Sequence, residues 1–364
     1  MWIGIFPELS EIGGIQQVSR HVGAVLVKNA QERNLPCQLL GLNDAPGQSC
    51  FKVGTRQYSF TGFGRNKLAL LLRLLRMMPR AQTICFGHVN LAPLGLILRA
   101  VRPRIKYWVV THGVEVWTPL PIIRREALRH AQGVISVSSD TADRMGKAQR
   151  LDRQRVSVLS PALDPAFMEA PCDVDIPSLQ PNSRMLLTVG RLISSEPGKG
   201  VDSVIAVLPD VLKAVPDLLY VVVGGGDLQR SLEELARKSP ARDRILFVGK
   251  LRLDQLKGYY SRSDVFVMPS RQEGFGIVFV EAMALGKAVI AGDHGGAPEV
   301  VRDGVTGYLI DSNDYKALTQ RLIQILQDEA LRKKMGEAGC ERVEQNFTFL
   351  HFQEKLTEIL DSAT

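Results

Sequence analysis

The chain has 364 residues, of which 45% are hydrophobic and 23% are charged, with a formal net charge of +7. This is an ordinary globular composition, and the length exceeds what one core needs, so we expect two domains. The sequence contains no run of about 18 uncharged apolar residues, so no membrane-spanning helix is expected. The five cysteines are scattered along the chain, which argues against a disulfide framework or a zinc site.

Short β-rich apolar runs alternate with longer helical patterns along the chain, which predicts parallel α/β layers. The strands predicted in the first half are residues 2–6, 37–42, 83–86, 107–111, 133–137 and 156–159. Those predicted in the second half are residues 185–189, 219–223, 245–248, 265–268, 288–290 and 308–310. Between the two sets, residues 160–183 contain five prolines and little periodicity, which indicates a linker.

We therefore expect two doubly wound domains, residues 1–165 and 166–345, and a final helix within 346–364 that returns to the first domain. Two such domains joined by a hinge would face each other across a cleft. Ligands in open α/β sheets bind at the carboxyl ends of the strands, so the binding residues are expected in the loops that follow strands.

Two glycine-rich turns follow predicted strands. Gly13-Gly14 comes after the first strand and before a helical pattern, and Gly224-Gly225-Gly226-Asp227 comes directly after the strand at 219–223. Backbone N–H groups at such turns can bind phosphate, and glycine lets the backbone approach a ligand closely. An ordinary tight turn needs the same residues, so both interpretations stay open.

The segment 269–282 carries the strongest signal. A predicted strand leads into a loop with two glycines and then into an apolar helix at about 277–285. Glu273 lies in the loop and Glu281 in the helix, on the order of 10–12 Å apart, with a helix N-terminus suited to a diphosphate between them. A carboxylate in an apolar helix is costly unless it is paired or binds a ligand; an ordinary surface glutamate is the alternative.

The two glutamates, with Gly274-Phe275-Gly276 after the first, resemble the E-x7-E signature of retaining glycosyltransferases of the GT-B fold. Further motifs are similar to those of glycosyltransferase family 4. They are Gly13-Gly14, Val189-Gly190-Arg191-Leu192, Lys199-Gly200, Gly295-Gly296-Ala297-Pro298-Glu299 and Gly304-Val305-Thr306-Gly307-Tyr308-Leu309. The resemblance covers essentially the whole chain. It implies the GT-B fold, with two Rossmann-like domains and the donor bound mainly to the second.

The resemblance also implies roles for the matched residues. Arg191 and Lys199 would bind the donor diphosphate and stabilise the charge on the leaving group, which fixed cations can do without a metal. Glu273 would contact the transferred sugar, and Glu281 would accept hydrogen bonds from the ribose hydroxyls. The other donor-binding positions implied are Gly14, Gly225, Lys250, Gly274, Phe275, Gly276 and Ile277, with the amides of Gly14, Gly276 and Ile277 at the phosphate oxygens.

His112 ends a predicted strand and matches the family's active-site histidine near the sugar C6 hydroxyl. A histidine after a strand can also be structural, but its position at the carboxyl end favours a role in the site. His88 is a weaker candidate, either structural or on the acceptor side.

The chain departs from the family pattern at two places. Residues 194–197 lengthen the interval between Arg191 and Lys199, which keeps both cations but leaves the placement of Lys199 open. Residues 161–164 read Pro-Ala-Leu-Asp where the family usually has Asn-Gly-Val-Asp. This difference affects the expected geometry of the hinge but not the residues expected to carry the chemistry.

Positive charge is concentrated in the first half. Residues 1–170 hold 22 Lys and Arg against 11 Asp and Glu, whereas the remainder holds 23 against 27. The interval between Asp44 and Glu115 contains 11 basic residues and no acidic ones. Within it, residues 65–80 have the pattern of a basic amphipathic helix, which suits an anionic membrane surface, although a solvated helix face is the alternative. The basic sector of this helix is formed by Arg65, Arg73 and Arg76.

The chain is thus expected to be a retaining, metal-independent hexosyltransferase without a cofactor. Its expected partners are a UDP-, GDP- or ADP-linked sugar donor, and a glycan or lipid-linked acceptor in cell-surface polysaccharide or glycolipid synthesis. Nucleic acid is not expected, because no nucleic-acid-binding motif accompanies the basic residues. Residues 1–8 do not resemble a signal peptide, which predicts a cytoplasmic enzyme, peripheral to the membrane through 65–80.

Two alternatives remain. One is a nucleotide-sugar 2-epimerase of the same fold, which would need catalytic carboxylates in the first domain, where Glu8, Glu11 and Glu115 lie near strand ends. The other is a non-catalytic sugar-binding protein. The presence of both Arg191 and Lys199 and the context of Glu273 and Glu281 favour sugar transfer over these alternatives.

Overall fold

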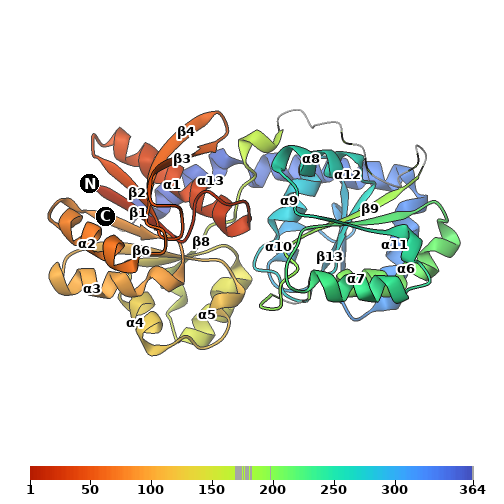
Figure 1. Ribbon diagram of the computed structural model, residues 1–364, viewed down its shortest axis with the longest axis horizontal. Coiled ribbons are helices and arrows are strands. Elements are labelled where there is room, and N and C mark those ends of the chain that lie inside the picture. The colour runs from red at the N-terminus through yellow and green to blue at the C-terminus, as the bar shows by residue number, and fades with distance from the viewer. Residues whose placement is uncertain (169–173, 175, 177–179, 181–182, 197, 363–364) are drawn as a thin grey trace. The chain divides into compact units, whose positions relative to one another are not determined.

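The computed structural model describes residues 1–168, 174, 176, 180, 183–196 and 198–362. The chain divides into two compact units, one made of Met1–Ala166 with Thr348–Thr364 and the other of Phe167–Phe347. Each unit is a sheet flanked by helices, as the alternating sequence pattern predicts (Figure 1). Of the prolines in the expected linker, Pro171, Pro177 and Pro181 lie outside the described residues.

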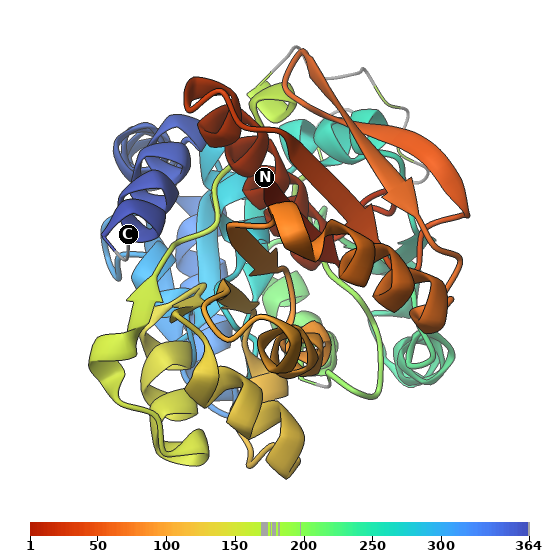
Figure 2. The same ribbon diagram turned by 90° about the vertical axis from the view of Figure 1, so that its left-hand side faces the viewer.

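The first unit is built on an eight-stranded sheet with the order β3-β4-β2-β1-β5-β6-β7-β8. The strands are β1 (Trp2–Phe6), β2 (Cys37–Gly41), β3 (Gly47–Val53), β4 (Arg56–Gly62), β5 (Thr83–Phe86), β6 (Lys106–Thr111), β7 (Gly133–Ser136) and β8 (Val156–Val158). All neighbours pair in parallel except β3 and β4, which form an antiparallel hairpin. Figure 2 shows this hairpin in orange at one end of the sheet and the yellow-green β8 at the other.

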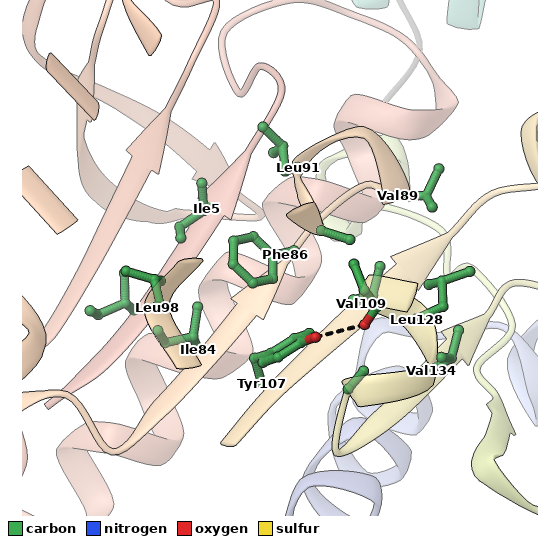
Figure 3. Close-up of a cluster of buried hydrophobic side chains, with 14 of the residues drawn as sticks. Ile5, Ile84, Phe86, Val89, Leu91, Leu98, Tyr107, Val109, Leu128 and Val134 are labelled. Atoms are coloured by element: carbon green, nitrogen blue, oxygen red, sulfur yellow. Dashed lines mark hydrogen bonds between the residues drawn. The ribbon is translucent and has the colours of Figure 1, made fainter. Parts of the chain in front are cut away.

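Helices cover both faces of this sheet. They are α1 (Gly14–Glu32), α2 (Lys67–Met77), α3 (Pro93–Val101), α4 (Ile122–His130), α5 (Ser139–Gln149) and α13 (Phe349–Asp361), with 3-10 turns η1 (Met78–Arg80), η2 (Val89–Leu91), η3 (Val114–Val116) and η4 (Arg153–Arg155). Helices α2 to α5 share one core with Ile5, Phe86 and Tyr107 (Figure 3). In this core the Tyr107 hydroxyl donates a hydrogen bond to the Ala127 carbonyl at 2.6 Å, so the buried phenol is satisfied.

Helix α13 belongs to the first unit although it follows the whole second unit in sequence. Its apolar side shares a core with α1 on the face opposite α2 to α5. The Asn29 side chain donates to the Thr357 hydroxyl at 3.0 Å, and Arg33 pairs with Asp361 at 2.6 Å. The final helix therefore supplies part of the first unit's core.

The sequence pattern does not predict the β3–β4 hairpin. Strand β3 buries only Phe51 and Val53, strand β4 buries only Phe60 and Gly62, and most of their remaining residues are exposed. Such an edge hairpin lacks the continuous apolar run that marks the other strands, because only one of its faces is covered.

The basic helix predicted over 65–80 is shorter than expected. Helix α2 begins at Lys67, where the Asn66 side chain accepts a hydrogen bond from the Ala69 amide at 2.9 Å and caps the helix. Arg65 precedes the cap with a φ of 67°, so it is not part of the helix. The expectation of three arginines on one helix face is wrong for Arg65 and holds for Arg73 and Arg76.

The second unit is built on a six-stranded parallel sheet with the order β11-β10-β9-β12-β13-β14. The strands are β9 (Met185–Val189), β10 (Leu219–Val223), β11 (Ile245–Gly249), β12 (Val265–Met268), β13 (Ala288–Gly292) and β14 (Gly307–Ile310). The pattern predicts each of these strands to within two residues. The chain runs outward from β9 to β11 and then returns to β12 on the other side of β9, so the strand order reverses between β9 and β12.

Helices again cover both faces. They are α6 (Val201–Ala214), α7 (Gln229–Lys238), α8 (Leu253–Arg262), α9 (Ile277–Ala284), α10 (Ala297–Val300), α11 (Tyr315–Gln327) and α12 (Glu329–Asn346), with the 3-10 turn η6 (Arg242–Arg244). The 3-10 turn η5 (Pro165–Met168) lies at the boundary of the two units in sequence. Helices α6, α7 and α11 cover one face, and α8 and α9 lie on the other (Figure 1). On that second face Tyr260, Phe266 and Phe279 form a buried aromatic cluster.

None of the helices in the described part of the chain is both long and apolar enough to cross a bilayer. The thiols of Cys37, Cys50, Cys85 and Cys340 are free, and Cys172 lies outside the described residues. Burial raises the pKa of the thiols of buried Cys85 and partly buried Cys37 to about 12, so neither forms a thiolate readily.

Candidate active site

The two predicted cations of the second unit and one of its two predicted carboxylates lie in two neighbouring loops. Residues 190–200 follow β9 and carry Arg191 and Lys199, and residues 269–276 follow β12 and carry Glu273. The strand order reverses between β9 and β12. In open α/β sheets such a reversal leaves a crevice at the carboxyl ends of the strands, where ligands bind.

Arg191 and Lys199 line one pocket of about 200 Å³. Arg271 also lines it and adds a third positive charge, although its guanidinium is paired with Asp202 at 3.1 Å. The motifs do not point to Arg271, and the signal that could have identified it is its position in the loop just after β12, which ends at Met268. The carboxylates of Glu196 and Asp202 also line this pocket, so an anion that binds there competes with them for the three cations.

The two predicted cations are each paired with a carboxylate. Lys199 Nζ donates to Glu273 Oε2 at 2.9 Å, and both side chains are largely buried. Arg191 Nη2 donates to both carboxylate oxygens of Glu196, at 2.6 and 2.8 Å. The first pair joins Lys199, which is expected at the diphosphate, to Glu273, which is expected at the sugar. The longer loop thus still places Lys199 beside Glu273.

Helix α9 begins at this site. Gly276 precedes it with a φ of 96°, a conformation that favours glycine, and no side chain caps the helix. Ile277 is its first residue. The loop before it is held in place because the Gly296 amide donates to the Glu273 carbonyl at 2.8 Å.

Gly274 and Phe275 lie in this held loop. The Phe275 side chain is buried and packs edge-on against Phe347, with ring centroids 5.7 Å apart. The Phe275 side chain therefore offers no surface to a ligand, whereas half-buried Gly274 has no side chain to obstruct one.

Glu281 is buried in α9, with 7% of its surface exposed, so the alternative of an ordinary surface glutamate is wrong. Its Oε2 accepts a hydrogen bond from the Tyr260 hydroxyl at 2.8 Å. Burial raises the pKa of Glu281 to about 7, and the hydrogen bond from Tyr260 opposes this shift. The sequence gives no signal for Tyr260, because nothing local indicates that α8 places it against α9.

The glycine turn after β10 packs against the loop that carries Arg191. A β-carbon on Gly224 would lie 1.8 Å from the Gly190 carbonyl oxygen, so only glycine allows this approach. The stem of exposed Lys250, which follows β11, lies beside Gly225. The turn thus brings Gly225 and Lys250 together next to the first loop of the site, and an open groove of about 820 Å³ continues from Gly226 between α7 and β11.

In the first unit, residues 7–13 follow β1 at the point where the strand order reverses between β1 and β5. Helix α1 starts at exposed Gly14 and has no side-chain cap. Buried Asp44 holds the loop, because its carboxylate accepts hydrogen bonds from the amides of Leu9 and Ser10, both at 2.9 Å, and from the Ser10 hydroxyl at 2.5 Å. The motif analysis does not find Asp44, which lies more than thirty residues from the loop it fixes.

Asp44→Asn is expected to lower the free energy of unfolding by about 1–3 kcal/mol, because an amide NH₂ would face backbone donors that now bond to a carboxylate. Urea denaturation measures the loss, and hydrogen exchange at Leu9 and Ser10 locates it. Asp243→Asn, at an exposed position in the second unit, is the control and should change neither quantity. Unchanged exchange at both amides would contradict the assigned role of Asp44.

His112 and His88 lie on neighbouring loops, after β6 and β5, and their rings stack with centroids 5.6 Å apart. His112 Nε2 lies 2.8 Å from the Gly87 carbonyl, and its amide donates to Glu115 at 2.5 Å. His88 Nδ1 accepts from the Asn90 amide at 3.1 Å. Burial, together with the nearby His112, lowers the pKa of His88 to about 3, so this ring is neutral at pH 7. The structure thus brings the weaker candidate into contact with the stronger one.

Among the described residues, no three His, Cys, Asp or Glu side chains cluster as a metal-binding group. The groups that could hold a ligand in the second unit are instead cations, an uncapped helix start and two carboxylates. This arrangement can bind a phosphate-containing molecule and the hydroxyls of a sugar.

Two parallel-sheet α/β units, with arginine, lysine and glutamate gathered where the strand order of the second sheet reverses, define a glycosyltransferase of the GT-B fold. The chain belongs to glycosyltransferase family 4. The family model described as Glycosyltransferase Family 4 matches residues 13–167, and the model described as Glycosyl transferases group 1 matches residues 174–342.

Known relatives agree with this assignment. The chain is 32% identical over 304 residues to the GDP-mannose-dependent alpha-(1-6)-phosphatidylinositol monomannoside mannosyltransferase of Mycobacterium tuberculosis, which covers 77% of this chain and 75% of the relative. Among solved structures, sucrose-phosphate synthase of Thermosynechococcus elongatus has a TM-score of 0.78 at 20% identity, covering 99% of this chain and 98% of that one. HepE of Anabaena in complex with UDP-glucose has a TM-score of 0.75 at 17% identity and covers both chains completely. The two structures share the fold.

Proposed function

We propose that this glycosyltransferase moves a hexosyl group from a nucleoside diphosphate sugar to a glycolipid, with retention of the anomeric configuration and without a metal. The observation that carries the proposal is the meeting of Arg191, Lys199 and Glu273 at the reversal of the second sheet. Fixed cations there would stabilise the leaving diphosphate. Arg271, which lines the same pocket, would add to this charge.

In the proposed donor complex, Arg191 and Lys199 bind the diphosphate and the uncapped start of α9 supports its oxygens. Glu273, already bonded to Lys199, accepts hydrogen bonds from hydroxyls of the transferred sugar. Glu281 accepts from the ribose, since Tyr260 occupies one of its oxygens and leaves the other for a ligand. The acceptor hydroxyl attacks on the face from which the diphosphate leaves, and the leaving phosphate takes its proton. The role that the family resemblance implies for His112 stays a prediction.

GDP-mannose is the donor to test first, because the relatives with substantial identity over most of the chain bear the name of GDP-mannose-dependent enzymes. Their names also give a phosphatidylinositol monomannoside as acceptor, which supports a lipid-linked acceptor here. A thermal-shift series with GDP, UDP and ADP and their sugars identifies the base, because a ligand that binds the native state raises the melting temperature. Absence of a shift with all of them would contradict the proposed donor site.

Retention and metal independence need separate measurements. NMR of the product from an α-linked donor should show an α-linkage, and the rate should not change after treatment with EDTA. A β-linked product would overturn retention, and loss of activity that Mg²⁺ restores would overturn metal independence. Conversion of the donor to its 2-epimeric nucleotide sugar without transfer would favour the epimerase alternative.

Contact with an anionic membrane is part of the proposal. Leu68 and Leu72 of α2 are 65% and 45% exposed and lie on the same helix as Arg73 and Arg76. The neighbouring helices of the first unit also expose large apolar side chains beside basic ones. These are Ile97 and Val101 of α3 and Ile122 and Ile123 of α4. Exposed apolar residues among cations suit the interface of an anionic bilayer.

Vesicles with anionic lipid are therefore expected to co-sediment with the protein, and vesicles of neutral lipid are not. The double variant Leu68→Gln/Leu72→Gln should bind the anionic vesicles several-fold more weakly, because it removes two exposed apolar side chains from α2. Leu235→Gln, an exposed apolar position on α7 of the second unit, is the matched control. Equal sedimentation with both kinds of vesicle would count against the membrane contact.

A further inference from the structure

Glu196 holds the guanidinium of Arg191 in a two-oxygen contact. Arg191 Nη2 lies 2.6 Å from Oε1 and 2.8 Å from Oε2 of Glu196. Glu196 belongs to residues 194–197, the stretch that lengthens the interval between Arg191 and Lys199 relative to the family pattern. The cation expected to bind the donor is thus covered by a carboxylate that its own loop supplies.

The loop that carries Glu196 is anchored on both sides. The Ser194 amide and hydroxyl donate to the two oxygens of Asp227, at 2.8 and 2.5 Å, and the Glu196 amide donates to the Ile193 carbonyl at 3.1 Å. On the other side, the Arg271 amide donates to the Gly198 carbonyl at 2.7 Å. These contacts of Ser194, Glu196 and Gly198 place Glu196 beside Arg191.

A carboxylate and a phosphate compete for the same donor groups of a guanidinium, since both accept two hydrogen bonds from its planar fork. The pair is accessible to solvent, with side-chain exposures of 50% for Arg191 and 29% for Glu196. Exposed ion pairs are weak, so an incoming diphosphate can displace the carboxylate at small cost. The Lys199–Glu273 pair is more buried, at 16% and 13%, and is the firmer of the two.

We propose that Glu196 is an exchangeable counterion for Arg191 that sets the affinity of the site for the donor diphosphate. It occupies the anion-binding face of Arg191 when the site is empty, leaves when the diphosphate binds, and returns as the nucleoside diphosphate product departs. This inference rests on the proposed function, because it takes the pocket of Arg191 and Lys199 to be the diphosphate site.

Glu196→Gln tests the proposal by the sign of its effect. The variant keeps the shape of the side chain but removes the competing charge, so GDP should bind about two- to fivefold more tightly, the range expected for an exposed ion pair. If Glu196 only supports the position of Arg191, the variant should bind GDP more weakly. Isothermal titration calorimetry with GDP, and with UDP and ADP in parallel, measures the dissociation constants.

Two further variants make the measurement specific. Asp210→Asn removes one negative charge from an exposed pair with Lys213 on α6, at 2.6 Å, and should leave the dissociation constant unchanged. In an Arg191→Ala background, Glu196→Gln should no longer tighten binding. Weaker or unchanged binding by Glu196→Gln, or equal tightening without Arg191, would overturn the proposal. Failure of the wild-type protein to bind any of the three nucleotides would instead overturn the proposed donor site, and this inference with it.

Discussion

Lys199→Ala is expected to lower the rate of sugar transfer by about 10²–10³-fold, the usual loss when one fixed group that stabilises developing charge is removed. In the proposed donor complex, Lys199 Nζ is the group that stabilises the negative charge growing on the leaving diphosphate. Its removal also leaves the largely buried carboxylate of Glu273 without its ion-pair partner, 2.9 Å away. Initial rates with a saturating donor measure the loss in kcat.

Lys213→Ala is the matched control, because its Nζ also pairs with a carboxylate in the second unit but the side chain is 78% exposed. It should transfer sugar at the wild-type rate. Lys199→Arg keeps the charge with a different shape and should recover part of the activity if charge is what matters. A Lys199→Ala protein that keeps its melting temperature and transfers within about threefold of wild type would disprove the role assigned to Lys199.

Glu281→Gln is expected to stabilise the fold above pH 7 and to weaken nucleotide binding. The pKa of Glu281 is raised to about 7 by burial, from an ordinary value of 4.5. Between these two pH values the native state binds more protons than the unfolded state, so wild-type stability falls as pH rises through this window and stays lower above it. Glutamine carries no charge and avoids this loss. The variant should therefore gain on the order of 1–3 kcal/mol at pH 8 and much less at pH 4.5.

Nucleotide binding should show the opposite trend. If the ionised carboxylate accepts hydrogen bonds from the ribose, GDP affinity of the wild type rises from pH 6 to pH 8, and Glu281→Gln loses both affinity and its pH dependence. Urea denaturation at pH 4.5 and pH 8 measures the effect on stability. Calorimetric titration with GDP at pH 6 and pH 8 measures the effect on binding. Glu329→Gln, from an exposed pair with Lys333 at 2.8 Å, is the control. An equal stability gain at pH 4.5 and pH 8 would show that the burial of the Glu281 charge is not its cause.

Most of the parallel strands could be predicted from the sequence because they are buried on both faces, and the partly buried edge strands β8 and β11 are still apolar enough to be recognised. Each of the six strands of the second unit reads as a short apolar run between turn residues, and this local pattern is sufficient to locate it. The position of the site could be predicted as well, because Arg191, Lys199 and Glu273 lie directly after strands that the pattern identifies. Motif and strand order then indicate the same end of the sheet.

Contacts between distant segments could not be predicted. The pairing of Lys199 with Glu273 and of Glu281 with Tyr260 depends on how β9, β12 and α8 pack, which no local pattern records. The exact start of α2 could not be predicted either, because helical periodicity does not show that Asn66 caps the helix and leaves Arg65 outside it.

The return of α13 to the first unit has a consequence for how the protein is made. On the ribosome, residues 1–166 emerge first, but the core that they share with Phe352 and Leu356 stays incomplete until the last helix has been synthesised. The part of α1 that packs against α13 lacks its partner during all of that time, whereas the second unit is contiguous in sequence and can close its core earlier. The order of folding during synthesis is therefore expected to be the reverse of the order of the units, with the first unit the more dependent on chaperones.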